Sequence, residues 1–158
     1  MEPMLAAARY NLKRSIEDYR RSLSGLDTTA LNWKPAAGDV NSMAVLTFHA
    51  WSSTRSWLSV ALGAPLPERD RDAEFLTSAT SADELRAWFE DIAKQCDALL
   101  STREPVDWAA MRKTHARPNP DDPQEVPAAF ALLHAMEHLR EHEGQMSLTR
   151  QLWEGRGA

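Results

Sequence analysis

Apolar residues recur every three or four positions over most of this chain, which is the spacing that places them on one face of an α-helix. The periodic stretches predict four helices, over about residues 3–23, 41–62, 81–101 and 127–155. Between them lie connections of roughly 17 to 25 residues, which contain most of the prolines. No stretch alternates with a period of two over a useful length, so we predict no sheet. The pattern therefore predicts an all-α fold, a four-helix bundle with long crossover connections.

Local signals at the ends of these stretches agree with the helix assignment. Asn41 or Ser42 can accept a hydrogen bond from the first turn of the second helix as its N-cap. Ser81 and Glu84 form the S-x-x-E pattern of a capping box at the start of the third helix. Pro127 suits the first turn of the fourth helix, because its missing N–H would have no partner there.

Composition narrows the class of protein. The chain has 158 residues, which suits one domain, 1–158, with its own core. Its net charge is −5 and its basic residues form no block, so nucleic-acid binding is not expected. No apolar run approaches the ~18 residues of a membrane span, and the N-terminus lacks the plan of a signal peptide. The single cysteine, Cys96, excludes an intrachain disulfide and fits a reducing cytoplasm. Its place on the apolar face of the third helix predicts a buried structural thiol.

Histidines are the feature of the sequence that points to chemistry. His134, His138 and His142 are spaced four residues apart on the fourth predicted helix, where that spacing shares one face. Two imidazoles on adjacent turns can converge on one metal ion. The core stripe of this helix consists of Ala131, Ala135, His138, His142, Met146, Thr149 and Trp153. His138 and His142 lie at its centre and are the predicted ligands, whereas His134 lies on one flank, outside the predicted ligand set.

A third ligand must come from another helix, and His49 is the candidate. It lies in the second helix on an inward stripe that is polar at its centre and contains Leu46, His49, Ser53, Ser56 and Val60. Three neutral imidazoles bind Zn²⁺ or Ni²⁺ and leave a coordination position open for water or a substrate atom. A di-iron carboxylate site is disfavoured, because it needs Glu-x-x-His twice and this chain has no such pattern. We therefore predict a divalent metal site at His49, His138 and His142, with a solvated histidine pair as the alternative.

Three polar residues near the predicted ligands are candidates for orienting them. Glu137 and Glu141 flank the histidines and could accept an imidazole N–H, or they could be solvated acids on the helix surface. Gln145 follows His142 by about one turn and could line the pocket or have an ordinary packing role. His115 lies in a loop rich in proline and charge, and no role is assigned to it.

Three segments of the chain are similar to one known family. The DinB/YfiT-like metalloenzymes have a second-helix start that resembles residues 31–51, LNWKPAAGDVNSMAVLTFHAW. Their fourth helix carries H-x-x-x-H followed by Gly-Gln, which resembles residues 134–145, HAMEHLREHEGQ, and residues 74–100 look like their third-helix start. The resemblance covers nearly the whole chain and implies a four-helix bundle with a long crossover between the second and third helices. It also implies a metal triad at the three histidines predicted above. Many members have a basic residue immediately before Gly-Gln, where this chain has Glu143, which changes the charge beside the site.

The same resemblance implies a function. Family members include metal-dependent transferases for low-molecular-weight thiols and a mycothiol-dependent isomerase. The resemblance therefore implies S-transferase chemistry on a small-molecule substrate, with a thiol as cosubstrate. It also implies that the protein is a homodimer. A divalent ion lowers the pKa of a coordinated thiol, and the same ion could activate water for hydrolysis. A non-catalytic metal-binding or stress-associated module stays open beside these two enzymatic functions.

One apolar surface of the fourth helix does not belong to the ligand stripe. Leu132, Met136 and Leu139 form an apolar edge there. We expect this edge to pack against a neighbouring helix or a second subunit.

Overall fold

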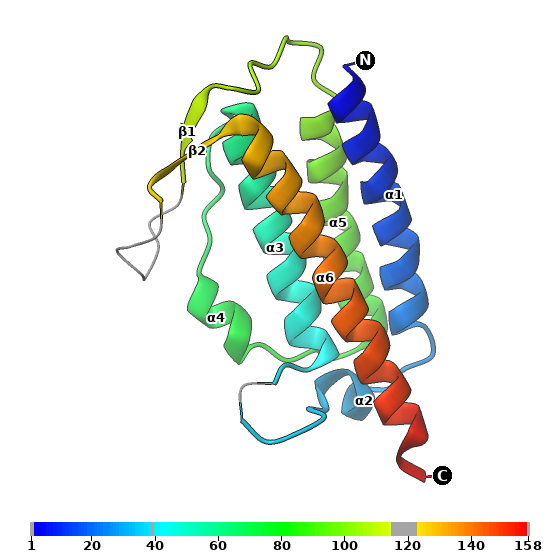
Figure 1. The fold of residues 1–158 in the computed structure, drawn as a ribbon. Helices are drawn as coiled ribbons and strands as arrows, with labels where there is room; N and C mark the ends of the chain where they lie inside the picture. The colour runs from blue at the N-terminus through cyan, green and yellow to red at the C-terminus, as the bar shows by residue number, and fades with distance from the viewer. Residues whose placement is uncertain (1, 39, 115–122, 158) are drawn as a thin grey trace.

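Long helices packed side by side dominate the structure (Figure 1). This computed structural model describes residues 2–38, 40–114 and 123–157. The long helices among them are α1 (Pro3–Leu23), α3 (Met43–Leu62), α5 (Ala82–Leu100) and α6 (Ala128–Glu154), which continues into the 3-10 turn η1 (Gly155–Gly157). Two short helices, α2 (Thr28–Asn32) and α4 (Arg71–Leu76), lie in connections where no helix was predicted. Both α1 and α3 pack against α5 and α6. The predicted all-α class and helical bundle are confirmed.

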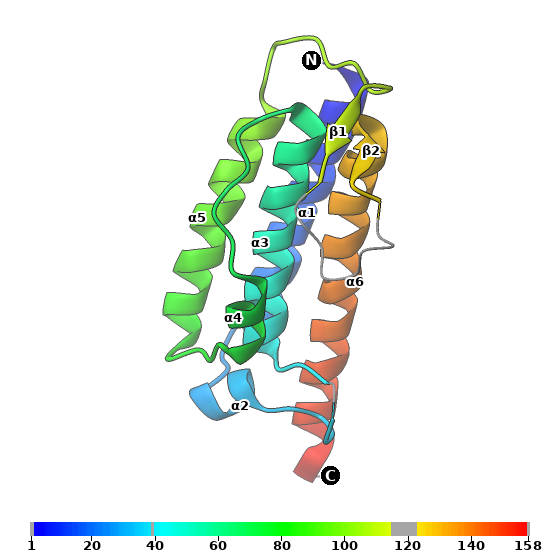
Figure 2. The same cartoon turned by 90° about the vertical axis from the view of Figure 1, so that its left-hand side faces the viewer.

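One connection returns along the length of the bundle. Because α3 and α5 run in the same direction, the chain must travel back from one end of the bundle to the other between them (Figure 2). Residues 63–81 make this return over α3 and contain α4, which packs against α3. This is the long crossover between the second and third predicted helices that the family resemblance implied.

Side chains and prolines start the helices close to where the sequence signals place them. Ser42 accepts a hydrogen bond from the first turn of α3 at 3.3 Å, so Ser42 rather than Asn41 is the N-cap. Ser81 accepts a hydrogen bond from the first turn of α5 at 3.1 Å. Pro127 directly precedes α6. Each of these contacts lies within a few residues of sequence, which is why the signals could be recognised.

The central helix α3 is buried on nearly all sides by its neighbours. It packs against α5, α6, α4, α2 and β1, and small residues such as Ser53 and Ser56 are among its buried positions. Trp51 is fully buried against the rings of Tyr19 on α1 and Phe89 on α5, with both ring centroids 5.4 Å from its own. This aromatic cluster joins three of the long helices and forms part of the core of the bundle.

Two short strands show that the prediction of no sheet is wrong. β1 (Met111–Lys113) pairs antiparallel with β2 (Glu125–Pro127), with Arg112 opposite Val126. Each strand has three residues, too few to display a period-two pattern in the sequence. Val126 is buried in the core and anchors the ribbon to the end of the bundle.

The apolar edge expected on the fourth helix lies inside the bundle. Leu132, Met136 and Leu139 are all buried in the core, so the expected packing against neighbouring helices is correct and a role in contacting a second subunit is wrong. The exposed large apolar side chains of α6 are Phe130, Leu133, Leu148 and Leu152. The homodimer stays a prediction.

Among the described residues, no helix is both long enough and apolar enough to cross a membrane.

Gly63 is a position where the fold depends on glycine. It ends α3 in the left-handed conformation with φ of 64°, and an added Cβ would lie 3.2 Å from Nη1 of Arg112. We expect Gly63→Ala to lower the free energy of unfolding by about 1–2 kcal/mol, the cost of that conformation for an L-residue. Gly144→Ala is the matched control, because Gly144 lies within α6 with nothing inside 4 Å of an added Cβ. It should raise the free energy of unfolding by about 0.5–1 kcal/mol. Urea denaturation measures both variants, and an undiminished stability of Gly63→Ala would contradict the argument.

Candidate metal centre

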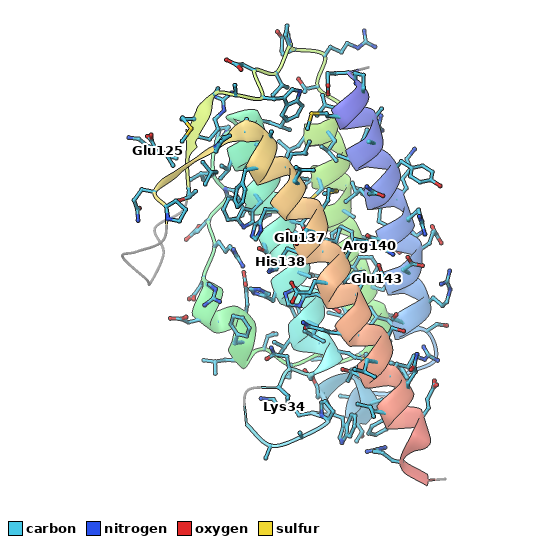
Figure 3. All side chains as sticks on the ribbon, in the orientation of Figure 1. Lys34, Glu125, Glu137, His138, Arg140 and Glu143 are labelled. Atoms are coloured by element: carbon cyan, nitrogen blue, oxygen red, sulfur yellow. The ribbon has the colours of Figure 1, made fainter. Side chains whose placement is uncertain are left out.

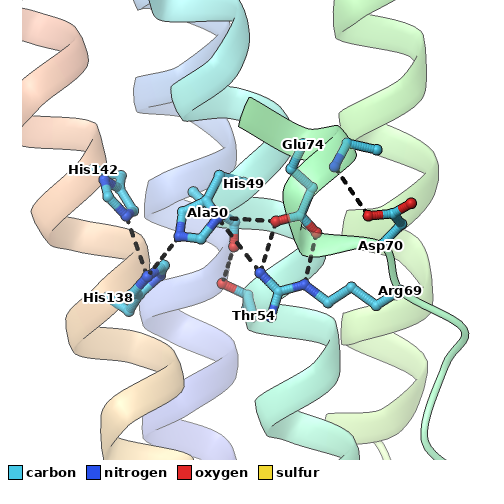
Figure 4. Close-up of polar contacts among 9 residues, drawn as sticks. His49, Ala50, Thr54, Arg69, Asp70, Glu74, His138 and His142 are labelled. Carbon is cyan, nitrogen blue, oxygen red and sulfur yellow. Dashed lines mark hydrogen bonds and ion pairs between the residues drawn. The ribbon is translucent and has the colours of Figure 1, made fainter. Parts of the chain in front are cut away.

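Three histidine side chains from two helices meet between α3 and α6 (Figure 4). His49 lies on α3, and His138 and His142 lie one turn apart on α6. The Nε2 atom of His138 lies 3.2 Å from Nε2 of His49 and 3.2 Å from Nε2 of His142. One nitrogen from each residue lies within 4.8 Å of the others. The structure thus brings together the three histidines that the sequence pattern selects, which we call the histidine triad.

A buried carboxylate holds the ring of His49. Nδ1 of His49 donates to Oε2 of Glu74 at 2.9 Å, and Glu74 is buried on α4. Arg69 donates to both oxygens of that carboxylate, from Nε at 2.6 Å and from Nη2 at 2.8 Å. Burial alone would raise the pKa of Glu74, but hydrogen bonds from Arg69 and His49 outweigh it and lower the pKa. The ionised carboxylate therefore fixes the proton of His49 on Nδ1 and leaves the lone pair on Nε2.

A side-chain amide holds the ring of His142 in the same way. Nδ1 of His142 lies 2.9 Å from Oε1 of Gln145, which can only accept a hydrogen bond. The amide NH₂ of Gln145 donates to Oε1 of Glu141 at 3.3 Å, and this contact fixes the orientation of the amide. His142 therefore carries its proton on Nδ1, and its Nε2 lone pair faces His138. Glu141 makes no hydrogen bond to the ring among the described residues, but it holds Gln145, and its charge opposes the lowering of the pKa of His142.

The three Nε2 atoms form a donor set that suits a cation. Burial, together with the neighbouring rings of His142 and His49, lowers the pKa of His138 to about 3, so this ring is neutral at pH 7. Burial also lowers the pKa of His142. A proton on Nε2 of His138 could be donated to Nε2 of His49 or to Nε2 of His142, but not to both. The remaining neighbour would then face His138 at 3.2 Å without a hydrogen bond.

The spacing of the nitrogens provides a second test of fit to a metal ion. Two imidazole nitrogens bound to a tetrahedral Zn²⁺ at about 2.0–2.1 Å lie about 3.3–3.4 Å from each other. The two separations of 3.2 Å in the triad are close to this value. The residues present therefore fit a divalent ion in donor type, and two of the three nitrogen separations match its spacing, while the third is at most 4.8 Å.

Other histidines and acids selected from the sequence lie outside the triad. Glu137 lies on α6 near His138 (Figure 3). It is exposed and makes no hydrogen bond to the triad within the described residues. The ring of His134 packs against Trp57 and Phe130, with centroid separations of 4.5 and 5.7 Å. His115 lies outside the described residues. The placement of His134 on the flank of the helix agrees with its exclusion from the predicted ligand set.

Glu143, which stands where many family members have a basic residue, faces α1. It pairs with Arg140, which also pairs with Asp18 at 2.8 Å. Burial raises the pKa of Glu143, and Asp18 adds to this shift while Arg140 opposes it. Glu143 thus belongs to a charge network between α6 and α1 and is not placed against the histidine triad.

Sequence reasoning missed the two residues that hold His49. Glu74 and Arg69 lie in a charged stretch predicted as a connection, where each acid looks like solvated surface. Nothing local distinguishes Glu74 from the neighbouring acids Asp70 and Asp72. Only the path of the crossover over α3 buries Glu74, to 8% exposure, and brings it to the triad.

The fold and the site together define a helical bundle with a three-histidine cluster between two of its long helices. The chain belongs to the DinB superfamily, whose family model matches residues 11–146. No curated protein matches it. The comparison with solved structures finds similar folds.

Three of these structures illustrate the similarity. A conserved protein from Enterococcus faecalis has a TM-score of 0.74 and 16% identity, over 96% of this chain and 97% of that one. A DinB-like protein from Bacillus cereus has a TM-score of 0.66 and 17% identity, over 88% and 85%. A mycothiol-dependent maleylpyruvate isomerase has a TM-score of 0.62 and 19% identity, over 88% of this chain and 59% of that one. At these identities the similarity concerns the fold.

Proposed function

We propose that His49, His138 and His142 bind one divalent metal ion, Zn²⁺ or Ni²⁺, and that the chain is a metal-dependent thiol S-transferase. The observation that carries this proposal is the convergence of three imidazole Nε2 atoms, two of them with their lone pairs directed inward by Glu74 and Gln145. The fold shared with a mycothiol-dependent isomerase supports a low-molecular-weight thiol as cosubstrate.

The chemistry of such a site is thiol activation. A divalent ion held by three neutral imidazoles lowers the pKa of a coordinated thiol, so that a thiolate nucleophile exists near neutral pH. The sulfur would then attack an electrophilic carbon of a small substrate, and the leaving group would depart with the bonding electrons.

The residues of this chain prepare the site for that chemistry. Glu74 accepts the hydrogen bond from Nδ1–H of His49 and makes Nε2 of that ring a stronger electron-pair donor to a metal ion. Arg69 compensates the charge of the buried carboxylate. His49 is buried, whereas His138 and His142 are half-buried, so the part of the triad that solvent reaches lies on α6. His138 has no such partner, since its Nδ1 makes no hydrogen bond with the described residues.

Metal loading followed by a thiol-transfer assay tests the proposal. Chelator-treated protein is reloaded with one equivalent of Zn²⁺ or Ni²⁺ and mixed with cysteine or glutathione and a chromogenic aryl halide. We expect thioether formation that requires the metal and is lost in His138→Ala. Stoichiometric metal without turnover over a panel of thiols and electrophiles would favour the non-catalytic module. Metal-dependent hydrolysis of ester substrates without thiol would favour the hydrolase.

The role of Glu74 gives a separate prediction. Glu74→Ala should weaken binding of Zn²⁺ about 10- to 100-fold, the usual effect of removing a partner of a ligating histidine. Gln145→Ala should have a smaller effect, because this amide is exposed and water can replace it. The matched control is Glu68→Ala, an exposed acid of the same crossover that makes no hydrogen bond to the triad among the described residues. Competition with a chromogenic chelator measures all three affinities, and equal affinities for Glu74→Ala and Glu68→Ala would remove the proposed role.

A further inference from the structure

A cavity of about 650 Å³ opens between α3 and α5, separate from the histidine triad. It is walled by these two helices, by the first residues of the crossover, by the connection after α5 and by β1. Neither the triad nor Glu74 and Arg69 line it. Its volume lies in the range of about 300–1,000 Å³ that small-molecule sites occupy.

The lining of the cavity combines eight apolar residues with six polar ones, and two of the polar residues are arginines. Leu62, Leu99 and Val106 contribute apolar walls, and Arg55 and Arg112 contribute guanidinium groups. Nη1 of Arg55 donates to the side chain of Gln95 at 3.0 Å. The Nε atoms of both arginines are buried and make no hydrogen bond with any described residue.

These two guanidinium groups have no carboxylate partner in the described part of the chain. Both residues are half-buried, and a charged group that is partly withdrawn from water is normally paired with a counter-charge. Other half-buried arginines of this protein follow that rule, since Arg9 pairs with Asp97 and Arg69 pairs with Glu74. Glu104 also lines the cavity, but its side chain is exposed. The cavity therefore has positive charge to offer to a ligand.

We propose that this cavity binds a small amphiphilic carboxylate. The planar guanidinium fork matches a carboxylate in geometry as well as charge, and Arg55 and Arg112 would hold that end of the ligand. The apolar body of the ligand would lie against Leu62, Leu99 and Val106. This site is distinct from the metal centre and does not depend on the proposed thiol chemistry.

Calorimetric titration with octanoate tests the proposal. Metal-free full-length protein should bind one octanoate per chain, and 1-octanol, which has the same chain without the charge, should bind at least 10-fold more weakly. Arg55→Gln and Arg112→Gln should each lower the affinity for octanoate at least 10-fold. The matched control is Arg103→Gln, an exposed arginine close to the cavity that does not line it, which should keep the affinity of the wild type.

Two further variants keep the test decisive if an arginine variant folds poorly. Ala98 lines the cavity and is exposed on α5, so Ala98→Trp should fill the cavity and abolish octanoate binding while the protein stays folded. His138→Ala should bind octanoate as the wild type does, because the carboxylate does not use the triad. No octanoate binding, equal affinity for 1-octanol, or full affinity in Ala98→Trp would overturn the proposal.

Discussion

His138→Ala is expected to abolish stoichiometric metal binding and to lower the affinity for Zn²⁺ or Ni²⁺ by more than about 100-fold. Nε2 of His138 lies 3.2 Å from Nε2 of His49 and from Nε2 of His142, so it is the central nitrogen of the triad. Its removal leaves only two of the three proposed ligands. Changes that only disturb the orientation of a ligand cost about 10- to 100-fold, and the loss of a ligand should exceed them. Elemental analysis and chelator competition on purified, untagged protein measure the effect.

His134→Ala is the matched control for that experiment. It removes an imidazole from the same helix one turn away, but this ring packs against Trp57 and lies outside the triad. It should keep one equivalent of metal, whereas His49→Ala should lose it as His138→Ala does. Far-UV circular dichroism checks that all three variants are folded. Full metal content in folded His138→Ala would refute the assignment of the site.

Trp51→Ala is expected to lower the free energy of unfolding by about 3–5 kcal/mol, as for other large core aromatics. Trp51 is fully buried, and its ring contacts Tyr19 edge-on and stacks on Phe89, so the change opens a cavity where α1, α3 and α5 meet. Domains have total stabilities of about 5–15 kcal/mol, so this one change removes a large share. Urea denaturation followed by circular dichroism measures it.

Trp153→Ala serves as the comparison for the core tryptophan. Trp153 is half-buried near the end of α6, where its ring meets Trp33 with centroids 5.6 Å apart. Its removal should cost under about 1.5 kcal/mol, because water already reaches the ring and no closed cavity results. Equal losses in the two variants would mean that the aromatic cluster is not the main core.

Local sequence patterns were sufficient to predict the long helices and the meeting of the three histidines. Apolar periodicity and caps such as Ser42 and Ser81 act within one or two turns, so a single sequence displays them. His138 and His142 share a helix face by spacing alone, and His49 lies on the inward stripe of its helix. Two inward faces that must pack together bring these side chains to one place. Burial of Cys96, whose thiol pKa burial raises to about 12, follows from the same reasoning.

The features that sequence reasoning missed depend on contacts between distant segments. Glu74 is 25 residues from His49, and its burial requires the crossover to lie over α3. The two strands form by pairing of segments that are distant in sequence, with Arg112 opposite Val126. Each strand has three residues, which is too short for a recognisable alternating pattern in the sequence. The buried position of Leu132 was misjudged in part because a helix covered by several neighbours buries more than one stripe.

The proposed ligands lie far apart along the chain, and this separation would link metal supply to folding. His49 and His138 are 89 residues apart, so in the unfolded chain only His138 and His142 stay close in sequence, and they would bind a metal ion weakly. An ion that binds the folded form alone stabilises it by about 4 kcal/mol at a free concentration 1,000 times its dissociation constant. The unfolding midpoint would then depend on free metal, and a chelator would lower it. Under metal limitation the unfolded fraction would grow, and proteolysis of the unfolded chain would lower the amount of this protein.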